Sequence, residues 1–303
     1  MDPFTRYLPA LEREMRAITT PQADSPALLY GMLHYHLGWV DRDFQPVQRN
    51  AGKRLRPVFL LLATEAQGGP WQPALPVAAA VELLHNFSLI HDDIEDQDHL
   101  RHGYPTLWDL WGEAQAINAG DALFNLAYQA LLRLRARGVA PERILELQEG
   151  YLDTVTQLTE GQCRDIGFES AATIAEETYL QMVGGKTAAL LSLCCAAGGL
   201  LAEAPSAQVT ALREFGYNLG MSFQMQDDLL GLWGDSARTG KPVGSDLRQH
   251  KKTLPLLHGM AESVELRALL TLPALTEAEI TRAQQLLETT GSRAYTQARV
   301  RNY

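Results

Sequence analysis

The sequence predicts an all-α fold, a single large helical bundle around a central cavity. Apolar residues recur at helical spacing along most of the 303 residues, while alternating runs of β-branched residues and Asn-Gly or Asp-Gly hairpin signals are missing. Several of these stretches are apolar around most of their circumference, as helices inside a large bundle are. No long Pro/Ser-rich linker divides the chain. We therefore expect one domain over residues 1–303.

Six helices are expected, and breaks in the apolar pattern separate the first four of them. The helices are, in order, Val58–Ala66, Pro76–Ile90, Ala114–Arg135, Ala140–Leu158, Ala175–Ala202 and Ala204–Met225. The breaks between and after them fall at Gly68–Pro70, Gly103–Pro105, Gly138–Pro141 and Gly234–Ser245, which are rich in Gly and Pro. The longest apolar stretch, Thr187–Ala202, is too short to span a bilayer and is expected to be a buried helix.

Composition excludes several classes of function. A net charge of −10 argues against nucleic-acid binding, which needs clustered Lys and Arg. The first 20 residues contain no uninterrupted apolar run of the kind found in a secretory signal peptide. The three cysteines lack metal-ligand spacing, so we interpret them as small core residues in a reducing compartment. The sequence thus predicts a cytoplasmic protein with no transmembrane segment.

Two clusters of aspartates, about 130 residues apart, carry the clearest chemical signal. The first is Asp92-Asp93-Ile94-Glu95-Asp96 and the second contains Asp227-Asp228, and each follows an apolar helical run. Residues i and i+4 share a helix face, so Asp92 and Asp96 can point to one place. Like charges packed this way repel each other, so a cation is needed to offset them. Hard oxygen ligands completed by water and phosphate are the usual way in which proteins hold Mg²⁺.

Cations gather in four further segments, two of them beside a helix start. Gly52-Lys53-Arg54-Leu55-Arg56 precedes a helix, where Lys53 offers a point charge and Arg56 a planar fork for phosphate oxygens. The other segments contain Arg101, Gly184-Gly185-Lys186-Thr187, and Lys241 with Lys251-Lys252. Acids with Mg²⁺, opposed by Lys and Arg, are the arrangement expected for one or two diphosphates. The apolar helices around them suggest that the rest of the ligand is hydrophobic.

In this order the segments resemble the trans-isoprenyl diphosphate synthases, also called polyprenyl synthetases. The resemblance covers roughly residues 50 to 256. It is carried by Gly52–Pro57, Asp92-Asp93-x-x-Asp96, Arg101-x-Gly103-x-Pro105-Thr106, Gly120-Asp121, Gly185-Lys186-Thr187, Phe223-Gln224-x-x-Asp227-Asp228, Gly240-Lys241 and Lys251-Lys252-Thr253-Leu254-Pro255. It implies the isoprenoid synthase fold, a homodimer, and joining of an allylic prenyl diphosphate to isopentenyl diphosphate with release of pyrophosphate.

The resemblance also implies roles for individual residues. Asp92 and Asp96 would bind two Mg²⁺ ions and Asp227 a third, all bridging to the allylic diphosphate. The remaining roles follow the two substrates. On the allylic side, the departing pyrophosphate would be stabilised by Arg101, Lys186 and Lys251. The allylic substrate itself would be held by Thr187, Gln224 and Lys241. On the isopentenyl side, isopentenyl diphosphate would be held by Lys53, Arg56, His85 and the position of His102. The released pyrophosphate would take the final proton.

Chain length in this family depends on bulk near the first aspartate. Phe87 and Ser88 lie five and four residues before Asp92. One aromatic beside a small residue resembles medium-chain members, and we expect a product of about twenty carbons, geranylgeranyl diphosphate. Phe87 as an ordinary core aromatic is the alternative.

Three positions depart from the family pattern. His102 stands where most members have a second Arg, and a neutral imidazole offers no bidentate fork. Gly231 replaces the last Asp of the second cluster, and Ala51 replaces the first Gly of Gly-Gly-Lys. His102 motivates an alternative, a terpene synthase that ionises a prenyl diphosphate without using isopentenyl diphosphate. A second alternative is a non-catalytic regulatory subunit of a synthase.

Overall fold

The computed structural model describes residues 2–49, 52–169, 171, 173–234, 244–272 and 274–303. The chain divides into two compact units. The first contains residues 1–150 and 194–212, and the second contains residues 151–193 and 213–303. Whether these units make up the single domain expected from the sequence stays a prediction.

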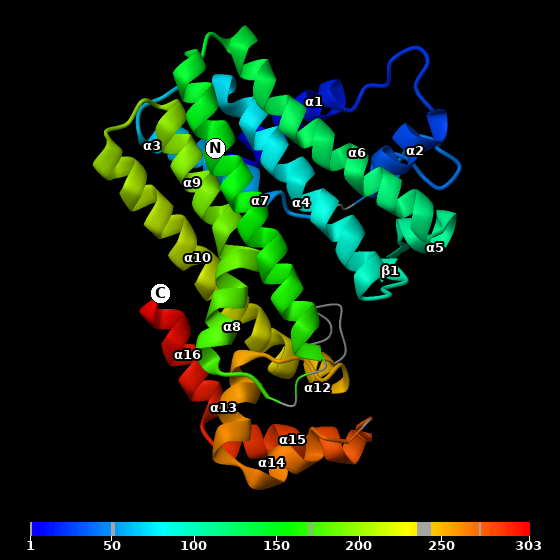
Figure 1. Ribbon diagram of the computed structural model, residues 1–303, viewed down its shortest axis with the longest axis vertical. Helices are drawn as coiled ribbons and strands as arrows, with labels where there is room; N and C mark the ends of the chain where they lie inside the picture. The colour runs from blue at the N-terminus through cyan, green and yellow to red at the C-terminus, as the bar shows by residue number, and fades with distance from the viewer. Residues whose placement is uncertain (1, 50–51, 170, 172, 235–243, 273) are drawn as a thin grey trace. The chain divides into compact units, whose positions relative to one another are not determined.

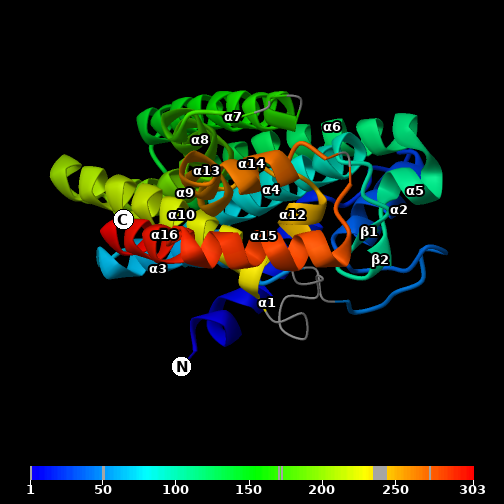
Figure 2. The same ribbon diagram turned by 90° about the horizontal axis from the view of Figure 1, so that it is seen from below.

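The first unit is built of helices and one short hairpin. Its core includes α4 and α6, which lie side by side in both ribbon views (Figures 1 and 2). The elements are α1 Pro3–Ile18, α2 Ala27–His36, α3 Leu55–Ala66, the 3₁₀ turn η1 Gln72–Ala74, α4 Leu75–Glu95, β1 Leu100–Arg101, β2 Tyr104–Pro105, α5 Leu107–Trp111, α6 Glu113–Leu132 and the 3₁₀ turn η2 Arg133–Arg137, with parts of α7 Pro141–Glu169, α9 Ala189–Leu201 and α10 Ser206–Trp233.

The second unit contains the remaining parts of α7, α9 and α10. Its other elements are α8 Glu176–Val183, η3 Gly184–Ala188, α12 Ser245–Arg248, α13 Leu254–Glu262, α14 Val264–Leu269, α15 Glu277–Thr289 and α16 Ser292–Asn302. One hydrophobic cluster joins Tyr179 of α8 to Met221 and Met225 of α10 and Leu254 of α13. A second cluster packs α13 to α15 together. The all-α prediction is confirmed.

Every expected helix is present, and several extend beyond the expected bounds. Helix α4 runs to Glu95, so that its last turn includes most of the first aspartate cluster. Helix α10 continues through Asp227-Asp228 to Trp233. Apolar periodicity marks the parts of a helix that face a core, and it stops where the functional carboxylates begin, although the backbone stays helical.

The segment expected as one helix over 175–202 is interrupted. Gly184–Ala188, which contains Lys186, forms a π-helical turn between α8 and α9. Here the backbone of η3 lies close to that of α7. A Cβ built on Gly161 would lie 2.3 Å from the Lys186 nitrogen, and one built on Gly185 would lie 2.4 Å from the Gln157 carbonyl oxygen. Only glycine permits such an approach, and π-turns of this kind often mark functional sites.

The structure also bears on two other sequence expectations. Two stretches, Gln72–Glu95 and Glu176–Leu201, are long and apolar enough to cross a membrane, but 72% and 83% of an 18-residue window in each is buried inside the protein, as in the core helix of a soluble protein. Cys194 and Cys195 are buried as expected, whereas Cys163 is exposed because it lies on the solvent side of α7.

Candidate functional site

Asp92 and Asp96 share one face at the end of α4. The Asp96 N–H donates to the Asp92 carbonyl oxygen at 2.8 Å, the i to i+4 geometry of a helix. Asp92 is half-buried and Asp96 is exposed. The expectation that these two carboxylates point in the same direction agrees with this backbone geometry.

The middle aspartate of the cluster has a different environment. Asp93 is 2% exposed, and its Oδ1 accepts from Arg101 Nε at 2.7 Å and Arg101 Nη2 at 2.6 Å. Burial raises the pKa of Asp93 to about 6, against the lowering effect of Arg101. Asp93 therefore fixes the side chain of Arg101, which the sequence placed near the allylic diphosphate. Sequence reasoning missed this partner.

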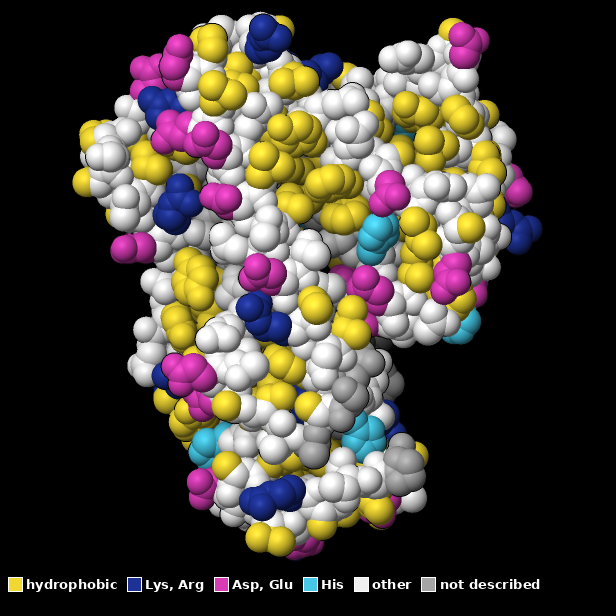
Figure 3. Space-filling view, viewed as in Figure 1, with side chains coloured by type: hydrophobic (Ala, Val, Ile, Leu, Met, Phe, Trp, Pro, Cys, Tyr) yellow, Lys and Arg dark blue, Asp and Glu magenta, His cyan; other side chains and the backbone are white. Residues whose placement is uncertain are grey.

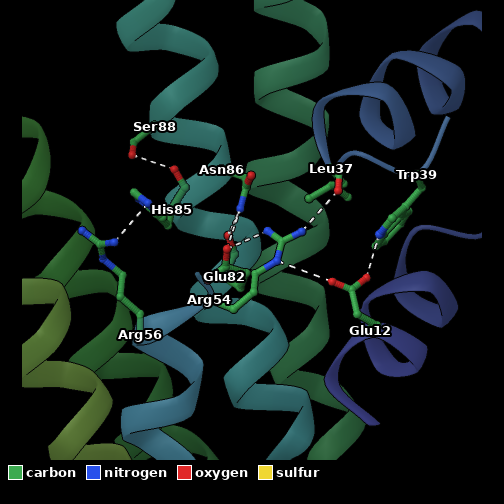
Figure 4. Close-up of polar contacts among 9 residues, drawn as sticks. All are labelled: Glu12, Leu37, Trp39, Arg54, Arg56, Glu82, His85, Asn86 and Ser88. Carbon is green, nitrogen blue, oxygen red and sulfur yellow. Dashed lines mark hydrogen bonds and ion pairs between the residues drawn. The ribbon is translucent and has the colours of Figure 1, made fainter. Parts of the chain in front are cut away.

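Arg56 and His85 form the centre of the expected isopentenyl site. Arg56 Nη1 lies 3.0 Å from His85 Nε2 (Figure 4). Burial and then the charge of Arg56 lower the pKa of His85 well below its usual value, so His85 is neutral and accepts this hydrogen bond. Arg56 Nε is buried and has no hydrogen-bond partner among the described residues. Lys53, three residues earlier, is exposed.

A buried ion pair holds the same segment in place. Arg54, at φ 51°, directs its guanidinium between Glu82 Oε1 of α4 at 2.7 Å and Glu12 of α1 at 3.5 Å (Figure 4). Arg54 Nη2 also donates to the Leu37 carbonyl at 3.2 Å, and Asn86 donates to Glu82. Arg54 is thus a structural residue, and it separates Lys53 from Arg56. The sequence alone does not distinguish it from its two basic neighbours.

His102 lies at the turn of a two-residue hairpin. His102 and Gly103 have φ values of 53° and 83°, which is the type I′ pattern, and Arg101 pairs with Tyr104 across it. A Cβ on Gly52 would lie 4.0 Å from His102 Nε2, so His102 adjoins the segment that carries Lys53. Burial, with the charges of Arg101 and Arg54, lowers the pKa of His102.

The second aspartate pair divides in the same way as the first. Asp227 is exposed, whereas Asp228 is 3% exposed. Asp228 Oδ2 accepts from the Tyr179 hydroxyl at 2.5 Å and from the Leu254 N–H at 3.0 Å. Its Oδ1 accepts from Gln224 at 3.2 Å. Burial raises the pKa of Asp228 to about 7, and these three donors lower it.

Further polar contacts fix the residues on η3 and α10 that are expected from the sequence to hold substrate. Thr187 Oγ1 donates to Gln224 Oε1 at 3.0 Å, which brings together two residues that the sequence separates by 37 positions. Lys186 Nζ lies 2.6 Å from Asp165 Oδ2 on α7. Asp165 follows Gly161 by four residues and so shares its helix face. This spacing is the one sequence signal that could have identified it.

The remaining expected site positions follow the second aspartate pair in the chain. Lys251 is exposed just before α13, and Lys241 lies outside the described residues. At Gly231, a Cβ would lie 2.1 Å from Asp246 Oδ2. The buried Asp246 carboxylate therefore fills the space in which a side chain at 231 would begin, and this explains the glycine there.

Phe87 and Ser88 lie on α4, one turn before Asp92. The Phe87 ring packs against Phe124 of α6, with centroids 5.1 Å apart, and against His91 at 4.7 Å. The Ser88 hydroxyl donates to the His85 carbonyl oxygen at 2.9 Å. An aromatic pair between α4 and α6 thus lies about one helical turn before Asp92.

The donor set fits Mg²⁺. Asp92, Asp96 and Asp227 supply oxygen only, while the buried neighbours Asp93 and Asp228 are held by protein donors. No three His, Cys, Asp or Glu side chains form a metal cage in the described part of the chain. Mg²⁺ needs no such cage, because one or two carboxylates commonly suffice when substrate phosphates and waters complete its shell.

Comparisons with known proteins agree with these observations. Residues 38–289 match the family model described as polyprenyl synthetase. The chain is 42% identical over 288 residues to the geranylgeranyl diphosphate synthase of Mycobacterium tuberculosis, spanning 93% of this chain and 79% of that one. It is 41% identical over 282 residues to a (2E,6E)-farnesyl diphosphate synthase of Mycobacterium bovis, spanning 90% and 77%.

A solved structure gives the same assignment. The crystal structure of a polyprenyl synthetase from Streptomyces coelicolor is similar with a TM-score of 0.90 and 36% identity, covering 98% of this chain and 89% of that chain. The family match, the relatives and the fold all agree with the isoprenoid synthase type expected above. The chain therefore belongs to the polyprenyl synthetase family and is a prenyltransferase.

Proposed function

We propose that the protein condenses an allylic prenyl diphosphate with isopentenyl diphosphate, head to tail and with Mg²⁺, releasing pyrophosphate. The product we propose is geranylgeranyl diphosphate. Relatives named for twenty-carbon and fifteen-carbon products are almost equally similar, at 42% and 41% identity. The choice of twenty carbons therefore depends on Phe87 and Ser88, not on similarity.

The arrangement of Arg56 carries the proposal. Its only hydrogen-bond partner among the described side chains is the neutral imidazole of His85, and its Nε has none. The nearby Glu82 is occupied by Arg54 and Asn86. Burial of the Arg56 Nε without a carboxylate partner is costly unless an anion binds to the guanidinium. The diphosphate of the second substrate would supply that anion.

The allylic diphosphate would be held through Mg²⁺ by the carboxylates of Asp92, Asp96 and Asp227. In this proposal Asp92 and Asp96 bind two ions and Asp227 a third, and bound Mg²⁺ supplies electrostatic stabilisation for the departing pyrophosphate. Lys186, Lys251 and Arg101 add fixed positive charge to the same leaving group. Thr187 and Gln224 position the substrate, with Lys241 contributing from the segment outside the described residues.

Two of these cations are paired with carboxylates before the reaction begins. Asp93 and Asp165 hold Arg101 and Lys186 in place before substrate binds, so less reorganisation is needed when the allylic C–O bond breaks. The isopentenyl double bond then attacks the allylic carbon, and the pyrophosphate released removes a proton from the new carbocation. No separate protein base is required.

Phe87 is proposed to limit the product length together with its packing partner. Because the ring contacts Phe124, the two aromatics form a rigid obstacle between α4 and α6, one helical turn from Asp92. A growing chain that meets both rings cannot extend further unless one is replaced by a smaller residue.

One observation favours a second candidate, a terpene synthase. His102 has a lowered pKa and cannot replace a charged fork, so the isopentenyl site lacks one of its usual contacts. In that case the protein would ionise a prenyl diphosphate and release a hydrocarbon or alcohol. Lys53, Arg56 and His85, which such an enzyme would not need together, favour condensation. A regulatory subunit would show neither activity alone.

We further propose a cytoplasmic homodimer. On the face seen in Figure 3, apolar side chains gather over α6 and the first part of α7. In the first unit Ile117 and Leu132 of α6 are 44% and 47% exposed, and Leu145 of α7 is 59% exposed. Contiguous exposed apolar side chains of this kind mark interaction surfaces. Light scattering coupled to size-exclusion chromatography would test the dimer.

Product analysis of the purified protein with Mg²⁺ tests the reaction. Dimethylallyl, geranyl, farnesyl and geranylgeranyl diphosphates would each be supplied with and without labelled isopentenyl diphosphate. We expect label in a prenyl diphosphate of twenty carbons. Pyrophosphate release with an unlabelled hydrocarbon or alcohol would instead establish the terpene synthase, and no turnover would point to the regulatory subunit.

A further inference from the structure

A second guanidinium lies beside His102 in the first unit. Arg49 and His102 line one cavity of about 40 Å³, together with Arg101 and Asp93. In the sequence Arg49 precedes Lys53, one of the expected isopentenyl ligands, by four residues. Arg101 is already bound to Asp93 in this cavity, whereas His102 is an uncharged neighbour.

Arg49 is held by aromatic rings. Its Cζ lies 4.7 Å from the centre of the Tyr35 ring and 4.4 Å from that of Tyr104. No carboxylate forms an ion pair with its side chain in the described ranges. Stacking fixes the plane of a guanidinium but leaves the N–H groups at its edge able to donate.

The two tyrosines connect Arg49 to the hairpin that carries His102. Tyr104 follows the His102-Gly103 turn directly, and the Tyr35 hydroxyl donates to the Pro105 carbonyl oxygen at 2.9 Å. The position of Arg49 is therefore set by the same hairpin that sets the position of His102. A cavity of this size can take the oxygens of a phosphoryl group but not a prenyl chain.

We propose that Arg49 supplies the forked contact to the isopentenyl diphosphate that the family's second Arg makes and that His102 cannot make. The proposal rests on the condensation reaction proposed above. It explains how Lys53, Arg56 and His85 can still bind isopentenyl diphosphate in a chain that has a neutral residue at 102. It also predicts that an arginine is needed at either 49 or 102 but not at both.

A structural role for Arg49, in which it only holds the loop against the hairpin, makes different predictions. Loss of a loop clamp would disturb both substrates and stability together. Loss of a ligand would affect one substrate alone, and an arginine supplied at 102 would restore it. Steady-state kinetics with both substrates, on the full-length enzyme with Mg²⁺, separates these cases.

The variants are Arg49→Ala, Arg49→Lys, His102→Arg and the double variant Arg49→Ala/His102→Arg. We expect R49A to raise the KM for isopentenyl diphosphate about 10- to 100-fold, the effect of losing one charge-assisted hydrogen bond, with the allylic KM unchanged. R49K should fall between R49A and wild type, because it keeps the charge and loses the fork. The double variant should return the KM to within a few-fold of wild type.

Arg16→Ala is the matched control. Arg16 is exposed and stacks on Trp39 at 4.2 Å, so this variant also removes a stacked guanidinium from the first unit. It should leave both KM values unchanged. Equal KM values for R49A and wild type, an equal rise for both substrates, or no recovery in the double variant would overturn the role of Arg49. Wild-type enzyme that does not incorporate isopentenyl diphosphate would overturn the condensation reaction as well.

Discussion

The Tyr179 hydroxyl donates a hydrogen bond to Asp228 Oδ2 at 2.5 Å, and both side chains are buried. The same carboxylate oxygen accepts from the Leu254 N–H at 3.0 Å. Asp228 thus connects α8, α10 and the start of α13, the helix that follows Lys251 in the chain. Its role differs from that of the adjacent Asp227, which is exposed.

Removing the Tyr179 hydroxyl should destabilise the fold. In Tyr179→Phe the buried carboxylate loses one of its donors, and we expect the free energy of unfolding to fall by about 1–3 kcal/mol. Urea denaturation followed by circular dichroism measures this change. Tyr217→Phe is the control, since Tyr217 is 37% exposed on α10. Equal unfolding free energies for Y179F and wild type would contradict the role assigned to this hydrogen bond.

Asp227→Asn should show the opposite behaviour. Asp227 is exposed, so its replacement should leave the unfolding free energy near that of wild type. If Asp227 binds Mg²⁺, loss of its charge should lower kcat/KM on the order of 100-fold, the scale seen when one electrostatic contact to a developing charge is removed. The measurement is product formation over a Mg²⁺ titration. Full activity of D227N at limiting Mg²⁺ would argue against Asp227 as a ligand.

The Arg54–Glu82 pair should be important for stability. Both side chains are buried, 2.7 Å apart, and removal of the Glu82 charge leaves Arg54 with only its longer contact to Glu12 at 3.5 Å. Glu82→Gln should therefore lower the free energy of unfolding by about 3–5 kcal/mol. The surface pair Arg282–Glu265 provides the control, because Glu265→Gln should have no measurable effect. A thermal melt in which both variants behave alike would refute the distinction.

Reducing the size of Phe87 should lengthen the product. Phe87→Ala removes one ring of the Phe87–Phe124 pair, and Phe124→Ala removes the other, so both variants should form prenyl chains longer than wild type. Val264→Ala is the control, because Val264 is 78% exposed on α14 of the second unit and should leave the product length unchanged. Reversed-phase chromatography of the dephosphorylated products gives the lengths. An unchanged product in both aromatic variants would make Phe87 an ordinary core residue.

Sequence reasoning reached the fold because apolar periodicity depends only on local spacing. It found α3, α4, α6, α7 and α10, although it ended α4 and α10 too early, where polar residues begin. It did not find the β1–β2 hairpin, because its type I′ turn uses His102-Gly103 rather than Asn-Gly. Turn type depends on backbone angles that several residue pairs can adopt.

The candidate site was predictable in its residue types but not in its pairings. The spacing of Asp92 and Asp96 gives their common face, whereas nothing local distinguishes Asp93 as the partner of Arg101. Lys186 and Asp165 likewise meet only because two glycines allow α7 and η3 to approach each other. Long-range pairs of this kind depend on tertiary packing, which a single sequence does not encode in any short pattern.

His36 should make stability depend on pH. It ends α2 half-buried, and its Nε2 atom is buried and has no partner among the described residues. Burial, followed by the charges of Arg101 and Arg54, lowers its pKa to about 3, so the folded protein holds it neutral. In the unfolded chain the same imidazole titrates near 6.5.

The sign of the effect follows from proton binding. Between about pH 6.5 and pH 3 the unfolded chain binds a proton at His36 that the folded protein does not, so the free energy of unfolding falls as the pH falls. The slope reaches about 1.4 kcal/mol per pH unit for this group and vanishes above roughly pH 7.

Urea denaturation of wild type and His36→Gln at pH 5.0 to 8.0, values chosen to span roughly the ordinary His pKa, should show the shallower slope in H36Q. Leu37→Ala, which removes a buried side chain but no titratable group, should lower stability at every pH and keep the wild-type slope. Parallel curves for H36Q and wild type would show that His36 is protonated equally in both states.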